Sequence, residues 1–264
     1  MFDPILLFTL ILLLGLIIPL GPPPIGKALP VLMYHQVRPE PSSDLAVSPA
    51  TFEHQLEQLR QKGYEGISFN DLAEHIDRKK PLPRRPVILT FDDGYADLET
   101  HALPLLKSYN MPSTVFLPVA MIGAQNSWDG GTDQLLDYDA LFRLAEHRVE
   151  YGLHTLRHTN LRHVSDQELF DDLTGCVQEL NENQLPHLPI LAYPYGAFHR
   201  HDAAKRRAMR RVLENAGIKF AVRIGSRINR IPLLKPFEVT RINVHNTDVD
   251  WRFALKLRRG RLRL

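Results

Sequence analysis

The sequence predicts an α/β protein in which a parallel sheet is covered by helices. Three observations favour this fold class. Apolar, β-branched segments alternate along the chain with segments whose apolar residues recur at helical spacing. Polar residues of types that serve catalysis or metal binding follow several of the predicted strands. In parallel α/β folds, active sites lie at this end of the strands. About 240 residues follow an N-terminal apolar segment, which suits one large domain. The alternation alone fits an open doubly wound sheet or a closed (β/α) barrel equally well.

The first predicted element is an apolar segment at the N-terminus. Residues 4–26 contain no charged side chain, and the run from Ile5 to Leu20 is nearly all Leu, Ile and Phe. This run is longer than the core of a typical signal peptide and slightly short for a spanning helix. Because Gly26-Lys27-Ala28 is a poor cleavage site, we expect residues 1–26 to be a membrane anchor or signal segment, and we favour an uncleaved anchor.

Alternating strands and helices follow the anchor. Ser48-Pro49 and Asn70-Asp71 are typical helix starts, and a Pro-rich linker covers residues 81–86. The predicted strands are 29–34, 87–91, 113–119, 149–153, 190–193 and 219–222, and the later predicted helices are 98–109, 138–145, 166–180 and 203–216.

Two further segments have a distinctive composition. The loop 123–133 is rich in Gly, Asn and Asp and carries Trp128, which either lines a sugar groove or anchors a plain surface loop. Residues 251–264 form a basic C-terminal tail, which either contacts an anionic lipid surface or polymer or is a solvated helix end.

Composition excludes several classes of protein. The formal net charge is only +2 and basic residues outside the tail are scattered among acids, so we expect no nucleic-acid partner. Cys176 is the only cysteine, which excludes a disulfide framework within the chain and a cysteine-based zinc site.

The strand at 87–91 ends in Asp92-Asp93-Gly94, which is the most informative feature of the chain. Two ionised carboxylates at the end of a buried strand are costly unless a cation or a proton offsets their repulsion. Alone, this tripeptide fits a turn or a helix N-cap equally well.

Two histidines four residues apart, His154 and His158, are further candidate ligands for such a cation. A helical turn or a tight loop aims both imidazoles at one point. With 12 histidines in the chain such a pair is expected by chance, so the prediction depends on the combination with the aspartates. Two imidazoles and one carboxylate make a three-ligand site with an open position, which suits Zn²⁺ and also Co²⁺, Ni²⁺ or Fe²⁺.

These motifs identify a resemblance. Thr90-Phe91-Asp92-Asp93-Gly94, then the segment 154–161, then Tyr193-Pro194-Tyr195-Gly196 resemble the ordered motifs of the polysaccharide deacetylases, carbohydrate esterase family 4, over residues 30–245. The resemblance implies a single catalytic domain, residues 27–250, folded as an irregular (β/α) barrel with about seven parallel strands.

The resemblance also implies residue roles. Asp92 corresponds to the general base, and Asp93, His154 and His158 correspond to the ligands of a divalent metal. Residues 31–37 resemble the subgroup that acts on exported poly-N-acetylglucosamine, in which His35 corresponds to the catalytic acid.

Three residues are expected to contact the substrate. Pro194 and Tyr195 belong to the third motif, where a backbone N–H near Tyr195 is expected to help hold the oxyanion, and Trp128 is the aromatic residue of the loop 123–133.

Two departures from the family pattern leave alternatives open. Most members carry the acid near the C-terminus, where this chain has His245, so His35 is favoured over His245 without excluding it. Members also carry an arginine shortly before the proline of the third motif, which helps to orient the catalytic aspartate. Here Leu191 and Ala192 precede Tyr193-Pro194, so the sequence leaves open what orients Asp92.

The resemblance implies a metal-dependent hydrolase that removes N-acetyl groups from N-acetylglucosamine-containing polysaccharide. The alternatives are an O-acetyl esterase and a non-catalytic sugar-binding relative. We expect an acetylated polysaccharide as substrate, export to the cell envelope or periplasm, and membrane attachment through residues 4–26. The charges of Asp3, Lys27 and Arg38 would place the domain in the cytoplasm instead, and the resemblance outweighs them.

Overall fold

The computed structural model describes residues 26–41, 43–128 and 130–262. The predicted anchor, residues 1–26, therefore lies outside the described residues except for Gly26. Within the described ranges, no helix has both the length and the apolar character needed to span a bilayer.

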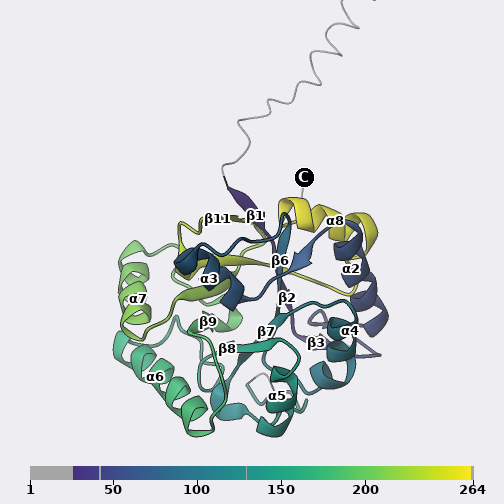
Figure 1. Ribbon diagram of the computed structural model, residues 1–264. Coiled ribbons are helices and arrows are strands. Elements are labelled where there is room, and N and C mark those ends of the chain that lie inside the picture. Colours follow the sequence, from purple (N-terminus) through teal and green to yellow (C-terminus); the bar gives the residue numbers. More distant parts are fainter. Residues whose placement is uncertain (1–25, 42, 129, 263–264) are drawn as a thin grey trace, which may run out of the picture.

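Twelve strands and seven α-helices are described, with four shorter helical turns (Figure 1). The strands are β1 (Lys27–Leu29), β2 (Val31–Tyr34), β3 (Gln36–Val37), β4 (Ala46–Val47), β5 (Glu65–Gly66), β6 (Pro86–Asp92), β7 (Ser113–Leu117), β8 (Val149–Leu153), β9 (Ile190–Ala192), β10 (Phe220–Ile224), β11 (Asn229–Ile231) and β12 (Val239–Asn243). The helices are α2 (Pro49–Gln61), α3 (Phe69–Arg78), α4 (Leu103–Ser108), α5 (Tyr138–Ala145), α6 (Asp166–Glu182), α7 (Ala203–Asn215) and α8 (Asp250–Arg259), and the short turns are η1 (Leu98–Ala102), η2 (Val119–Met121), η3 (Pro194–Gly196) and η4 (Pro236–Glu238).

Seven parallel strands close into a barrel, which confirms the predicted fold class. The order of strands around the ring is β2, β6, β7, β8, β9, β10 and β12. The short strand β5 pairs with the first two residues of β6. Closure depends on β2, because Leu32 lies opposite both Ile242 of β12 and Leu89 of β6. The helices α2 and α4–α8 surround this ring (Figure 1).

The strands are nearly continuous apolar runs because a barrel strand is buried on both faces. All seven residues of β6 are buried, including the two polar ones, Thr90 and Asp92. Phe69 of α3 contacts Phe116 of β7 and Phe220 of β10, which lie on different sides of the ring. Because Phe220 is the first residue of β10, α3 closes the barrel at the amino-terminal ends of the strands.

Most predicted elements are present, but the short strands β3, β4, β5 and β11 were not predicted, and three larger elements also differ from the prediction. The predicted helix 98–109 is divided into the π-helical turn η1 and α4. The seventh barrel strand, β12, was not among the predicted strands. The described part of the predicted basic tail forms α8, whose Phe253 and Leu257 are buried in the main hydrophobic core.

Candidate active site and metal centre

The predicted site residues gather at the carboxyl-terminal rim of the barrel. His35 directly follows β2, Asp92 is the last residue of β6, and His154 directly follows β8. Tyr195 lies in η3, two residues beyond Tyr193, which follows β9. Parallel strands that start at one end of a barrel deliver the residues after them to the same rim.

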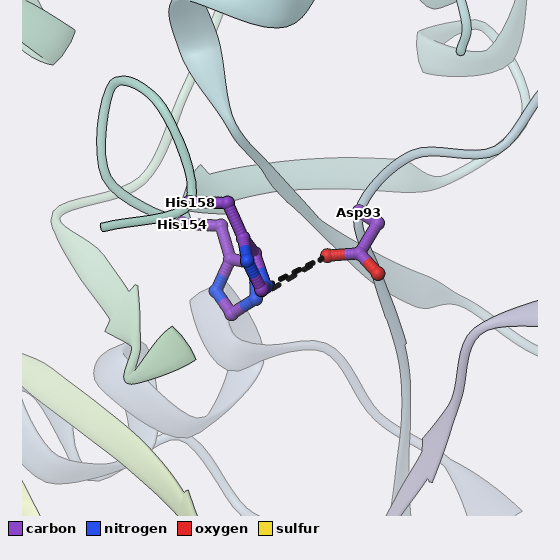
Figure 2. Close-up of side chains that lie close together, drawn as sticks. All are labelled: Asp93, His154 and His158. Atoms are coloured by element: carbon purple, nitrogen blue, oxygen red, sulfur yellow. Dashed lines mark ion pairs between the residues drawn. The ribbon is translucent and has the colours of Figure 1, made fainter. Parts of the chain in front are cut away.

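Asp93, His154 and His158 form one cluster of buried side chains. Asp93 Oδ1 lies 3.4 Å from His154 Nε2 and 3.4 Å from His158 Nε2. Figure 2 shows the two imidazoles side by side with the carboxylate facing them. One ligand atom from each residue lies within 4.8 Å of the other two, so a single ion can contact all three.

Unusual backbone conformations aim these side chains. Asp93, Thr155 and His158 have positive φ angles of 72°, 66° and 56°. For residues other than glycine this left-handed region costs about 1–2 kcal/mol each, and such strain concentrates at functional sites. In Asp93 it turns the second carboxylate out of line with β6, toward the histidines. The pair His154 and His158 is therefore presented by a tight loop, one of the two arrangements left open by the spacing.

The protonation states of the imidazoles fit metal ligation. Burial lowers the pKa of His154 to about 4, an effect that the Asp92 carboxylate only partly offsets. Burial and the neighbouring His154 lower the pKa of His158 to about 3. Both rings are thus neutral at pH 7. His154 Nδ1 lies 2.9 Å from the Ala192 carbonyl, to which it donates, leaving the Nε2 lone pair directed at Asp93.

The donor set therefore fits a divalent ion. A carboxylate oxygen and two neutral imidazole nitrogens are ligands that Zn²⁺ and its borderline-soft relatives accept, and three protein ligands leave a coordination position open.

Asp92 is held by Arg241 in a bidentate ion pair. Arg241 Nη1 donates to Oδ1 at 2.5 Å and Nη2 donates to Oδ2 at 2.7 Å, and the guanidinium is fully buried. Burial alone would raise the pKa of Asp92, but Arg241 and the nearby His154 outweigh it and hold the pKa well below its usual range. Asp92 is therefore a carboxylate at neutral pH.

Arg241 reaches Asp92 through the inside of the barrel. Its side chain also donates to Thr90 Oγ1 at 3.2 Å and lies 5.4 Å from the centroid of the Phe116 ring. Those residues belong to β6 and β7, which do not adjoin β12 in the ring.

Arg241 is the functional residue that the sequence did not assign. No arginine stands directly before Tyr193-Pro194, and the contact with Asp92 that the family pattern places there is made instead from β12. The available signal was a single cation, Arg241, in a short segment that begins with Val239 and contains Ile242.

Of the two candidate acids, His35 lies beside Asp92. Its Nε2 is 3.9 Å from Asp92 Oδ2. Burial lowers the pKa of His35, Asp92 opposes that effect, and Arg241 and His245 add to it. A protonated His35 is therefore a stronger acid than an exposed histidine. His245 Nδ1 lies 3.2 Å from the Asp44 carbonyl, and none of its described contacts reaches Asp92 or the three-residue cluster.

Two aromatic side chains flank His158. The Trp128 ring stacks on the imidazole at 4.7 Å between centroids, and the Tyr195 ring meets it edge-on at 4.4 Å. Tyr195 is 54% exposed and has a φ of 57°, whereas the preceding Pro194 is buried. Rings beside a polar cluster offer stacking surfaces for the apolar faces of a sugar.

Polar contacts hold the described residues of the loop 123–133 beside the site. Asp133 accepts from Arg38 Nη2 at 2.8 Å and from Gln36 Nε2 at 2.9 Å, and its N–H donates to Asn126 Oδ1. Asn126 in turn donates to the Tyr95 hydroxyl. The loop that carries Trp128 is thus tied to the segment after His35 and to the segment after Asp93.

Comparison with known proteins agrees with this geometry. The family model described as "Polysaccharide deacetylase" matches residues 79–221, more than half of the chain. Of the solved structures, the Streptococcus pyogenes deacetylase PplD in complex with acetate superposes with a TM-score of 0.73 at 18% identity, covering 88% of this chain and 99% of that one. IcaB from Ammonifex degensii has a TM-score of 0.70 at 24% identity, covering 88% and 97%. These two likenesses establish the shared fold.

Curated relatives match part of their own length. The Bacillus subtilis (strain 168) protein YxkH is 26% identical over 170 residues, 64% of this chain and 57% of that protein. A Staphylococcus aureus (strain N315) protein named poly-beta-1,6-N-acetyl-D-glucosamine N-deacetylase is 24% identical over 181 residues, 66% of this chain and 60% of that protein. The chain thus spans about 60% of the length of these relatives.

Proposed function

Because the chain belongs to the polysaccharide deacetylase family, we propose that it hydrolyses the N-acetyl groups of a polysaccharide that contains N-acetylglucosamine. The observation that carries the proposal is the convergence of Asp93, His154 and His158 beside a carboxylate that Arg241 keeps ionised. The same set would serve an acyl transfer to water, which needs a base, an acid and a Lewis acid.

The chain's own residues divide the chemistry between them. Asp93, His154 and His158 would hold a divalent ion, most readily Zn²⁺, which when bound supplies Lewis-acid activation of water and of the acetyl carbonyl. Asp92 accepts the proton that water loses as its oxygen bonds to the carbonyl carbon. The carboxylate retains lone pairs for this purpose although both oxygens accept from Arg241.

Breaking the amide bond requires a proton on the leaving nitrogen. A protonated His35, which lies beside Asp92, donates this proton. Acetate and a neutral sugar amine are then released, and no amine anion has to form. Trp128 and Tyr195 stack against the sugar ring and orient the acetyl group toward the cluster.

Two names support the substrate class. The Staphylococcus aureus relative and an Escherichia coli (strain K12) protein, 33% identical over 90 residues, are both named poly-beta-1,6-N-acetyl-D-glucosamine N-deacetylase. The alignment with the Escherichia coli protein covers only 13% of that protein. The alignment with the Staphylococcus aureus protein is longer and is therefore the stronger support. We propose that this chain acts on a related exported polymer, in the cell envelope, attached to the membrane by residues 4–26.

Acetate release from β-1,6-linked N-acetylglucosamine oligomers tests the proposal. We expect the wild-type chain to release acetate and Asp92→Asn to lose at least about a hundredfold in kcat, since it lacks the base. Parallel assays on O-acetylated xylan oligomers separate an amidase from an esterase. Activity confined to esters, or full activity of Asp92→Asn, would contradict the proposal.

The role of the acid is tested by a matched pair of histidine variants. His35→Ala should lower kcat by about 10²–10⁴, because the amine then leaves without a positioned proton donor. His245→Ala should stay within a few-fold of wild type, because its described contacts lie outside the cluster. The reverse pattern would assign the acid to His245.

A further inference from the structure

A cluster of exposed basic side chains lies at the other end of the barrel from the candidate active site. It consists of Lys27, Lys62, Arg84, Arg85 and Arg258, and we call it the basal surface. Four of these residues line a single depression together with Ala28, Tyr64, Ala254 and Leu257; Lys27 adjoins it through Ala28.

The topology explains why segments distant in sequence meet there. Lys62 ends α2, Arg84 and Arg85 precede β6, Lys27 lies in β1 just before β2, and Arg258 is in the last turn of α8. In a (β/α) barrel, helix ends and strand starts share the amino-terminal rim. Figure 1 shows β1 and α8 next to each other at the same edge of the molecule.

The length of β6 gives the distance between the basal surface and the candidate site. Arg85 precedes its first residue, and Asp92 is its last. At a rise of about 3.3 Å per residue, the two ends are about 20 Å apart.

Among the described residues, no ion pair neutralises the charges of the basal surface. In the described part of the chain, none of its five cations has a carboxylate oxygen within 4.0 Å. Lys27 Nζ donates instead to the backbone carbonyls of Leu82 and Pro83, at 3.0 and 2.9 Å, and Arg85 Nη1 donates to the Lys62 carbonyl. The exposed acid of the adjoining strand β5 is Glu65, so cations predominate locally although the net charge of the chain is only +2.

The position of the basal surface indicates its partner. The apolar segment 4–26, predicted to enter a membrane, is followed immediately by Lys27. A domain tethered at that point has the basal surface close to the bilayer. Lysine and arginine are attracted to anionic headgroups within a Debye length, roughly 8–10 Å at physiological salt.

We propose that the basal surface docks onto anionic phospholipid headgroups and so directs the active-site rim away from the bilayer. Docking is separate from hydrolysis: it fixes the orientation of the barrel, with the candidate site about 20 Å from the headgroups and open to a polymer outside the membrane. The proposal uses the predicted anchor, and it holds whichever acetylated polymer is the substrate.

Amide hydrogen exchange of the full-length chain in lipid nanodiscs tests the proposal. Phosphatidylcholine discs with and without phosphatidylglycerol are compared, and exchange is followed in residues 60–66 and 254–260. We expect about tenfold slower exchange in the anionic discs, and loss of that protection at high salt.

Two variants with the same change of charge provide the control. Lys62→Glu/Arg84→Glu/Arg258→Glu alters side chains for which no hydrogen bond or ion pair is found in the described ranges, and it should abolish the slowing. Lys205→Glu/Arg207→Glu/Arg211→Glu, on exposed positions of α7, should keep it. Both should release acetate from soluble oligomers as the wild type does, which shows that they fold and separates a failure of docking from a failure of the proposed function.

Three results would overturn the proposal. Equal exchange in neutral and anionic discs would mean that the predicted anchor is the only attachment to the membrane. Equal loss of protection in both variants would indicate general charge attraction. The same slowing by inorganic phosphate without lipid would indicate a site for small anions.

Discussion

At the scale of single residues, the fully buried pair of Asp92 and Arg241 is central to the site. Removing one partner of such a pair leaves an uncompensated charge inside the protein, whereas removing both does not. The pair therefore has two separable effects. It fixes the orientation of Asp92, the proposed general base, and it allows an ionised carboxylate to stay buried in a stable barrel.

Replacing Arg241 separates the two effects. Arg241→Met should destabilise the protein by about 3–5 kcal/mol, because Asp92 is left buried and ionised or must take up a proton. It should also lower kcat strongly. The double variant Asp92→Asn/Arg241→Met should recover much of the stability without recovering activity. Urea unfolding and acetate release measure both quantities, and a double variant no more stable than Arg241→Met would contradict this role of the pair.

Asp97 gives a prediction about pH. Burial raises the pKa of this carboxyl to about 6, against the lowering effects of the Val37 N–H and Arg38, and Asp133 raises it further. Between the usual pKa and this value the folded state binds more protons than the unfolded state. The free energy of unfolding that Asp97 contributes therefore falls as the pH rises from about 4 to 6.

Asp97→Asn removes this dependence and keeps an acceptor for the Val37 N–H. We expect the variant to exceed the wild type by about 2 kcal/mol in unfolding free energy at pH 7, with the difference vanishing below pH 4. Exposed Asp139→Asn serves as the control and should change stability little at either pH. A difference that grows as the pH falls would contradict the sign.

At the scale of elements, the strands were easier to predict than the contacts between them. β6 and β8 follow from continuous apolar runs, and the residues after them from the motifs. β12 was missed because Arg241 and Thr240 interrupt its apolar pattern, although both are buried in the barrel. The partner of Arg241 lies 149 residues earlier in the chain, a pairing that only closure of the ring brings about.

The loop 123–133 shows what a local pattern can and cannot tell. Its composition indicated a loop with an aromatic residue but left two interpretations open. Trp128 stacks on His158, and Asp133 of the same loop accepts hydrogen bonds from Gln36 and Arg38, which are distant in sequence.

Asp133 is therefore expected to act on substrate binding through the loop. Asp133→Ala should raise KM about tenfold and leave kcat within about twofold of wild type, because the loop that carries Trp128 loses its fixed position while the cluster remains intact. Asp133→Asn, which keeps an acceptor for Gln36, should have a smaller effect. Kinetics on N-acetylglucosamine oligomers decide, and a fall in kcat at constant KM would contradict this assignment.

At the scale of the whole molecule, closure of the seven-stranded barrel brings the aspartates, the histidines and Arg241 together. Asp92 ends β6 and Asp93 follows it, the histidines come from the loop after β8, and Arg241 comes from β12. Sequence alone predicted the first two groups and the rim at which they meet. An open sheet would have matched the same alternation, but it would not have brought β12 beside β2 and its arginine across to β6.

The most direct test of the central claim is anomalous X-ray diffraction from crystals of the zinc-loaded protein, recorded on both sides of the zinc edge. One anomalous peak within about 2.0–2.3 Å of Asp93, His154 Nε2 and His158 Nε2 is the predicted result, and crystals of His158→Ala should lack it. Zinc bound elsewhere, with no peak among these three side chains, would contradict the assignment of the metal centre and the hydrolysis built on it.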